Sequence, residues 1–246
     1  MLAYGGLLAL SLSWFLLSGL FGPKFLNVIT RRLPSSVSLW LWLSGLYALL
    51  FSAITAAVSL GLLIGYGWST SSQADRGVGD LWYLFLVSVL PYVALALLGA
   101  LAAAVFTRLQ PALSAARSTN ALLRGSSSEI RNFNGVPIRV LETNVLAAAI
   151  VEVARQPIIL ITRGVLETLS ADELEAVYWH ELGHAFGEHN GLSRIALFAS
   201  TLTPWLPFTR EAQWAIGDLC ERSADGFAAS RVDSKVLQSA RQKFSF

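Results

Sequence analysis

Charged residues are distributed very unevenly along the chain, and their absence from long stretches predicts a membrane region. No Asp, Glu, Lys or Arg occurs in residues 1–23, 33–74 and 81–107. Each stretch can hold the roughly 20 apolar residues with which a helix crosses a bilayer. We therefore expect three transmembrane helices, near residues 2–22, 38–66 and 82–106. The first has no basic residue before its apolar run, which favours an uncleaved span over a signal peptide.

Basic residues near these stretches set the expected orientation. The first connecting loop is purely basic, with Lys24, Arg31 and Arg32, whereas the second carries Asp75, Arg76 and Asp80. The positive-inside rule then places the first loop in the cytoplasm and the N-terminus outside. We expect a multi-pass protein of the cell (plasma) membrane, with a transmembrane domain at 1–107 and a cytoplasmic domain at 108–246.

The segment after residue 107 alternates short apolar runs with turn signals, as a small α+β domain does. Asn134-Gly135 predicts a hairpin turn between strands at 130–133 and 137–141. Two further strands are expected at 147–153 and 157–162. The second is a β-branched run that begins with a proline, which favours the edge of the sheet. We expect this edge strand to pair with an extended substrate through Ile159, Leu160 and Ile161.

An amphipathic helix is predicted from about residue 171 to residue 189. It begins with the capping box Ser170-Ala171-Asp172-Glu173, and apolar residues follow at three- and four-residue spacing. The helix contains His180-Glu181-Leu182-Gly183-His184, which uses two of the three histidines of the chain. A separation of four residues places both imidazoles on one helix face, where they can hold one metal ion. Glu181 lies about 100° away, where it can act on water without binding the metal.

A catalytic zinc site usually has three protein ligands, so one more remains to be found. Glu221 is the best candidate, because a carboxylate on a second helix can complete a site of two histidines and one glutamate. Asp225 follows one turn later and can accept the free N–H of a ligating histidine. Glu211 competes but has no acidic partner at that spacing. A continuing helix would carry His189 off the metal face, so we expect it at a solvated helix end.

The composition and charge of the chain limit the classes of binding partner that we expect. The chain is 54% hydrophobic and 14% charged, with a formal net charge of +2. Its basic residues are scattered, so we expect no direct nucleic-acid partner. The single cysteine, Cys220, cannot form an intrachain disulfide, in agreement with a reduced compartment. One Gly61-x-x-x-Gly65 segment matches a motif through which membrane helices dimerise, so a homo-oligomer is compatible with the sequence.

The order of these elements resembles the membrane gluzincins of the BlaR/MecR antirepressor peptidase family. It is also similar to the HtpX and CAAX prenyl protease family, which shares the H-E-x-x-H and E-x-x-x-D motifs. Three spans before the motif and the Pro-Trp-Leu-Pro-Phe segment at 204–208 favour the first family. The resemblance implies a zincin-type metallopeptidase domain after the transmembrane helices. It implies His180, His184 and Glu221 as Zn²⁺ ligands and Glu181 as general base. Asp225 would accept a hydrogen bond from one of the ligating histidines.

The chain departs from these families at two places. Both commonly have an aspartate five residues after the second histidine, where this chain has His189. The β-lactam-sensing members continue into a penicillin-binding domain, whereas this chain ends at Phe246. We therefore do not expect it to sense β-lactams by that route.

The implied function is that of a membrane-embedded zinc endopeptidase whose partners are a polypeptide substrate and the lipid bilayer. Its substrate would be a cytoplasmic or membrane-proximal protein, such as a regulatory repressor. The alternatives are an HtpX-like membrane quality-control protease and a non-catalytic membrane receptor or scaffold with a zinc site. The presence of Glu181 favours an enzyme, because a purely structural zinc site needs no base.

Overall fold

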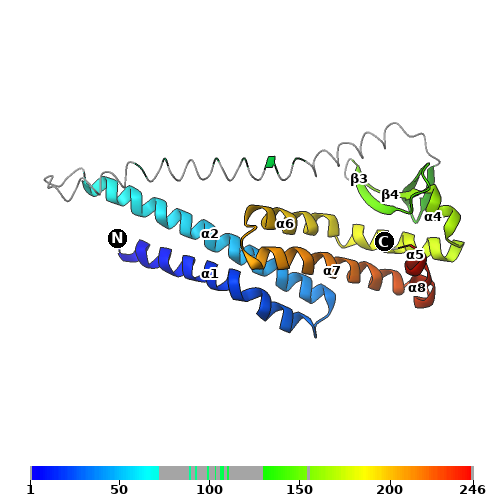
Figure 1. Cartoon of the computed structure of the whole chain (residues 1–246), viewed down its shortest axis with the longest axis horizontal. Coiled ribbons are helices and arrows are strands. Elements are labelled where there is room, and N and C mark those ends of the chain that lie inside the picture. Colours follow the sequence, from blue (N-terminus) through cyan, green and yellow to red (C-terminus); the bar gives the residue numbers. More distant parts are fainter. Residues whose placement is uncertain are drawn as a thin grey trace. The chain divides into compact units, whose positions relative to one another are not determined.

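The computed structural model describes residues 2–71, residues 130–153, residues 156–244 and isolated positions between 89 and 110 (Figure 1). The chain forms two compact units. The first unit comprises Met1–Arg32, Trp40–Ser114 and Ala196–Gln213, and the second comprises Leu33–Leu39, Ala115–Ile195 and Trp214–Phe246. The third predicted span, 82–106, lies outside the described residues apart from a few single positions.

The first unit contains two long apolar helices, α1 (Leu2–Thr30) and most of α2 (Ser35–Ser71). Both are long and apolar enough to cross a bilayer, over Tyr4–Thr30 and Ser35–Leu63. They cover the spans predicted at 2–22 and 38–66. Large apolar side chains are exposed along both helices, among them Leu10, Trp14, Phe21, Phe25, Trp40 and Phe51. Such an extended apolar surface is consistent with a membrane protein.

Residues 204–208 pack against these two helices within the same unit. They join α6 (His189–Leu202) to the start of α7 (Pro207–Ala229). Leu206 lies against Gly19, and Phe208 lies against Gly22 and Gly45, where larger residues would collide with it. The ring centroid of Phe208 is also 5.4 Å from that of Trp42. Both Leu206 and Phe208 are buried by this packing.

The second unit contains a four-stranded sheet with the order β1-β2-β4-β3. Its strands are β1 (Ile130–Phe133), β2 (Val136–Leu141), β3 (Ala148–Val153) and β4 (Gln156–Thr162). β1 and β2 form the predicted hairpin, in which Asn134 and Gly135 both have positive φ angles, 51° and 86°. These angles are typical of the type I′ turn that an Asn-Gly pair favours. β4 runs parallel to β2 and antiparallel to β3.

β4 is an interior strand, so the prediction of an edge strand at 157–162 is wrong. Ile159 pairs with Ile138 of β2 on one side and with Ile150 of β3 on the other. Ile159, Leu160 and Ile161 are buried, and their strand is bordered on both sides. The initial proline is tolerated because pairing with β2 begins only at Ile159, so no N–H is needed from Pro157 on that side. The edge strand next to β4 is β3.

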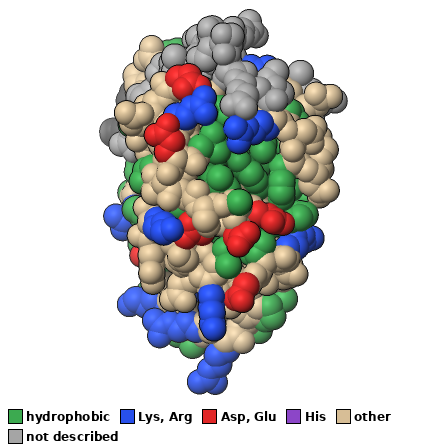
Figure 2. All heavy atoms as spheres, turned by 90° about the vertical axis from the view of Figure 1, so that its right-hand side faces the viewer, with side chains coloured by type: hydrophobic (Ala, Val, Ile, Leu, Met, Phe, Trp, Pro, Cys, Tyr) green, Lys and Arg blue, Asp and Glu red, His purple; other side chains and the backbone are tan. Residues whose placement is uncertain are grey.

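The described part of the second unit also contains α4 (Arg163–Thr168), α5 (Ala171–Phe186) and α8 (Ser234–Lys243), together with the start of α6 and most of α7. The predicted capping box begins α5, with the Ser170 side chain accepting from the Glu173 N–H and the Glu173 side chain accepting from the Ser170 N–H. α5 ends at Phe186, earlier than the predicted residue 189. Its apolar face joins the sheet in a core that includes Ile138, Val140, Ile159, Ile161, Val177 and Leu182. On the molecular face in Figure 2, acidic and basic side chains are interspersed around a hydrophobic area.

Candidate metal centre

His180 and His184 project from one face of α5 and meet a carboxylate from α7. The Nε2 atoms of the two histidines lie 3.0 Å apart. One carboxylate oxygen of Glu221 lies 3.5 Å from Nε2 of His180, and the other lies 3.5 Å from Nε2 of His184. The ligand atoms of the three residues lie within 4.8 Å of one another, as a metal site requires. The structure thus brings the three predicted ligands together.

The spacing of these atoms fits zinc. Tetrahedral zinc with bonds of about 2.0–2.1 Å holds its ligand atoms about 3.3 Å apart. The observed separations of 3.0 and 3.5 Å lie on either side of that value. Two imidazoles and one carboxylate also leave a fourth position, as in catalytic zinc sites. The side chain of His180 is 1% exposed and that of Glu221 is 47% exposed, so the site opens on the glutamate side.

Gly183, inside the motif, allows α7 to approach α5 closely. A Cβ atom at this position would lie 2.9 Å from Cα and 3.2 Å from the carbonyl oxygen of Ala224. These are backbone atoms, so α7 itself would have to move away. Ala224 lies between Glu221 and Asp225, and its side chain is fully buried. Gly183 therefore sets the distance at which both carboxylates reach the histidines, a role that sequence reasoning missed.

Asp225 contacts His180 at the ring nitrogen that faces away from the ligand group. Its Oδ1 lies 3.0 Å from Nδ1 of His180. A proton on Nδ1 leaves the Nε2 lone pair free for a metal, so this contact selects the ligating tautomer. Oδ2 of Asp225 pairs with Arg241 of α8 at 2.7 Å. Arg241 was not predicted, because no sequence signal separates it from the other basic residues of α8.

Glu181 is buried beside the two histidines, with 5% of its surface exposed. Burial raises the pKa of its carboxyl, while the imidazoles and a hydrogen bond from the backbone N–H of Ile150 act in the opposite direction. A carboxyl group whose pKa is closer to neutrality is suited to accept and return a proton. Glu221 differs, since hydrogen bonds with His180 and His184 hold its pKa well below the usual range and keep it ionised.

Comparison with protein families agrees with this geometry. Residues 140–215 match peptidase family M48. The match includes β4, both histidines of the motif and Glu181, and it ends before Glu221. It supports a metallopeptidase of family M48, whose members are zinc enzymes. No curated protein matches the chain. The closer likeness to the BlaR/MecR peptidases rests on the sequence motifs alone.

Among the described residues, neither Glu211 nor His189 belongs to the group of three possible ligands. Glu211 precedes Glu221 on α7 by about 15 Å of helix and is exposed. His189 is buried, with 3% exposed, so the prediction of a solvated helix end is wrong. Its Nδ1 lies 3.1 Å from Nδ1 of His184, the nitrogen that faces away from Glu221. Burial, followed by the neighbouring His184, lowers the pKa of His189 to about 4, so its ring is neutral at pH 7.

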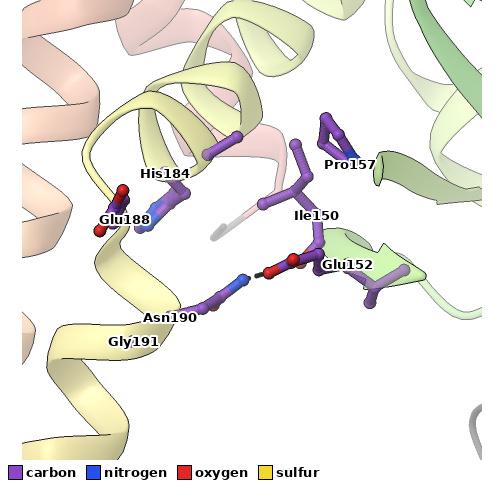
Figure 3. Close-up of a pocket in the computed structure, with 9 residues that line it drawn as sticks. Ile150, Glu152, Pro157, His184, Glu188, Asn190 and Gly191 are labelled. Atoms are coloured by element: carbon purple, nitrogen blue, oxygen red, sulfur yellow. Dashed lines mark hydrogen bonds between the residues drawn. The ribbon is translucent and has the colours of Figure 1, made fainter. Parts of the chain in front are cut away.

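A groove of about 430 Å³ opens beside His184. Figure 3 shows its two sides, with His184, Glu188 and Asn190 facing Ile150, Glu152 and Pro157. The Asn190 amide donates a hydrogen bond to the carbonyl of Ile150 at 3.3 Å. The groove therefore lies along β3, an edge strand of the described sheet.

Proposed function

We propose that this chain is a membrane-embedded zinc endopeptidase that cleaves a cytoplasmic or membrane-proximal protein. The observation that carries the proposal is the position of buried Glu181 beside two imidazoles and a carboxylate at zinc-ligand spacing. A structural zinc site has no use for a buried base next to its ligands. The match of residues 140–215 to family M48 supports the same reaction class.

In this proposal His180, His184 and Glu221 hold zinc, and Asp225 keeps His180 in the ligating tautomer. When bound, zinc supplies Lewis acidity, which polarises a peptide carbonyl and makes water a better nucleophile near neutral pH. Glu181 accepts the proton of the attacking water and passes it to the nitrogen of the departing amine.

We place the substrate along β3, in the groove beside His184. A peptide that adds to a sheet edge is held by main-chain hydrogen bonds, and its alternate side chains enter neighbouring pockets. β3 has a free edge in the described sheet, whereas β4 has none. The groove residues Glu152 and Glu188 would then face the side chains that flank the scissile bond.

We further propose that α1, α2 and the span predicted at 82–106 anchor the enzyme in the cell membrane, with residues 108–246 in the cytoplasm. The purely basic first loop supports this orientation. The similarity to BlaR/MecR peptidases suggests a regulatory repressor as the substrate. Cleavage of many unfolded membrane proteins would instead indicate HtpX-like quality control.

The variant Glu181→Gln tests the activity. Purified with zinc, it should keep about one zinc per chain and lose hydrolysis of an unstructured protein by at least about 100-fold, the usual worth of a general base. Glu211→Gln, which changes an exposed carboxylate of α7, is the matched control and should remain active. Normal hydrolysis by Glu181→Gln would overturn the proposal. Comparing cleaved proteins in cells that carry either variant would then identify the substrate.

A further inference from the structure

The turn after α5 returns His189 to the last turn of that helix. α5 ends at Phe186, and Glu188 adopts a positive φ of 52°, which a residue with a Cβ rarely does. Gly187 leaves the space for the imidazole, because a Cβ there would collide with Nε2 of His189. The chain thus combines an unfavourable backbone angle with a glycine to bury a polar ring against His184.

The contact between the two rings has a defined direction of hydrogen bonding. The Nε2 atom of His184 faces Glu221 and His180, so in the proposed zinc site its lone pair would be the one that binds the metal. The proton of a neutral imidazole then sits on Nδ1. Nδ1 of His189, at 3.1 Å, must offer a lone pair to this proton. The ring planes are nearly perpendicular, at 87°, so the contact is not a stack.

We propose that His189 is a positioning residue of the metal site, which accepts the Nδ1–H of His184 and fixes that ligand with Nε2 toward the zinc. This rests on the proposed zinc site and adds to it the device that orients its second histidine. The two ligating histidines are therefore supported differently. Asp225 presents a carboxylate to His180, whereas His189 presents a ring nitrogen to His184.

An isosteric pair of variants separates this role from simple packing. In His189→Asn the side-chain oxygen takes nearly the place of Nδ1 and can still accept, whereas His189→Leu has a similar shape and no acceptor. Zinc affinity is measured by competition with a chelator on the full-length protein in detergent, in a Glu181→Gln background. We expect His189→Leu to bind zinc about 10- to 100-fold more weakly, as for other residues that orient a ligand. His189→Asn should recover most of that loss.

Two results would overturn the inference: parental zinc affinity in His189→Leu, or equal losses in the Leu and Asn variants. If His189→Leu does not fold, Gly187→Ala provides the second test, because its methyl group displaces the imidazole while leaving it intact. Gly187→Ala should weaken zinc binding, and unchanged affinity would count against the role. His180→Ala separates this inference from the proposed site. If His180→Ala loses zinc and His189→Leu does not, only the role of His189 fails, whereas tight zinc binding by His180→Ala would refute the site itself.

Discussion

Glu173 in the first turn of α5 and Lys243 in the last turn of α8 form an ion pair with an Nζ to Oε1 distance of 2.7 Å. The same carboxylate accepts from the backbone N–H of Ser170 at 2.8 Å and from the hydroxyl of Ser239 at 2.7 Å. One side chain therefore caps the metal-binding helix and fastens α8 to it. α8 also carries Arg241, the partner of Asp225. One helix therefore contacts both the residue that caps α5 and the residue that supports His180.

These contacts predict a pH-dependent loss of stability. Lys243, followed by the N–H of Ser170 and the hydroxyl of Ser239, lowers the pKa of Glu173 from 4.5 to about 2. Since the folded-state pKa is depressed, the stabilisation is fully present above about pH 4.5 and is lost as the pH falls toward 2. We expect Glu173→Gln to lower the thermal midpoint of the metal-free protein at pH 7. The difference from the parent should shrink below pH 4.5. A control at the exposed Glu167, Glu167→Gln, should show no such change, and a constant difference for Glu173→Gln would contradict the prediction.

Removal of the third ligand should abolish stoichiometric zinc binding. Glu221→Ala takes away one of three ligands, whereas Glu211→Ala changes an exposed carboxylate on the same helix. Metal analysis after dialysis should find about one zinc per chain in Glu211→Ala and far less in Glu221→Ala. The opposite result would show that Glu211, and not Glu221, is the ligand.

The approach of α5 and α7 can be tested at Gly183. A methyl group there meets the backbone of Ala224, so Gly183→Ala should move Glu221 away and reduce zinc affinity. Helix propensity alone would instead favour alanine by up to about 1 kcal/mol. Gly217→Ala on α7 is the matched control, because apart from its own stretch of helix no described atom lies within 4 Å of the added methyl group. It should keep zinc affinity and gain stability, and a Gly183→Ala variant that behaves in the same way would exclude a spacing role.

Topology can be tested with single cysteines in a Cys220→Ser background. The positive-inside rule predicts that a membrane-impermeant thiol reagent labels Ser72→Cys on intact cells and spares Ser36→Cys. Labelling of both after permeabilisation is the control for reactivity. The reverse pattern on intact cells would place residues 108–246 outside the cell.

Sequence reasoning succeeded where the determining interactions are local. The capping box at Ser170 and the hairpin at Asn134-Gly135 each depend on residues close together in the chain, and both are present. The shared face of His180 and His184 follows from helical periodicity alone. The spacing of Glu221 from Asp225 made it a ligand candidate, and the structure places its carboxylate beside both histidines.

The remaining features depend on contacts between distant segments. Pro157 suggested an edge strand, but the register of β2 decides which N–H groups are needed. The position of His189 depends on where α5 ends. Helical periodicity predicted an end near residue 189, but Gly187 and Glu188 end the helix about one turn earlier. Arg241 reaches Asp225 only because α8 packs on α5.

The hydrogen bond from Asn190 to Ile150 has a consequence for selectivity. A peptide that extends along β3 finds this carbonyl already bonded, so its own N–H must take the place of the Asn190 amide. Exchange of one neutral hydrogen bond for another changes the free energy little, because no net bond is gained. Main-chain pairing at this point therefore contributes little affinity for any sequence. Discrimination between polypeptides falls to the side chains that enter the groove, and a tight inhibitor must gain its affinity there or at the metal.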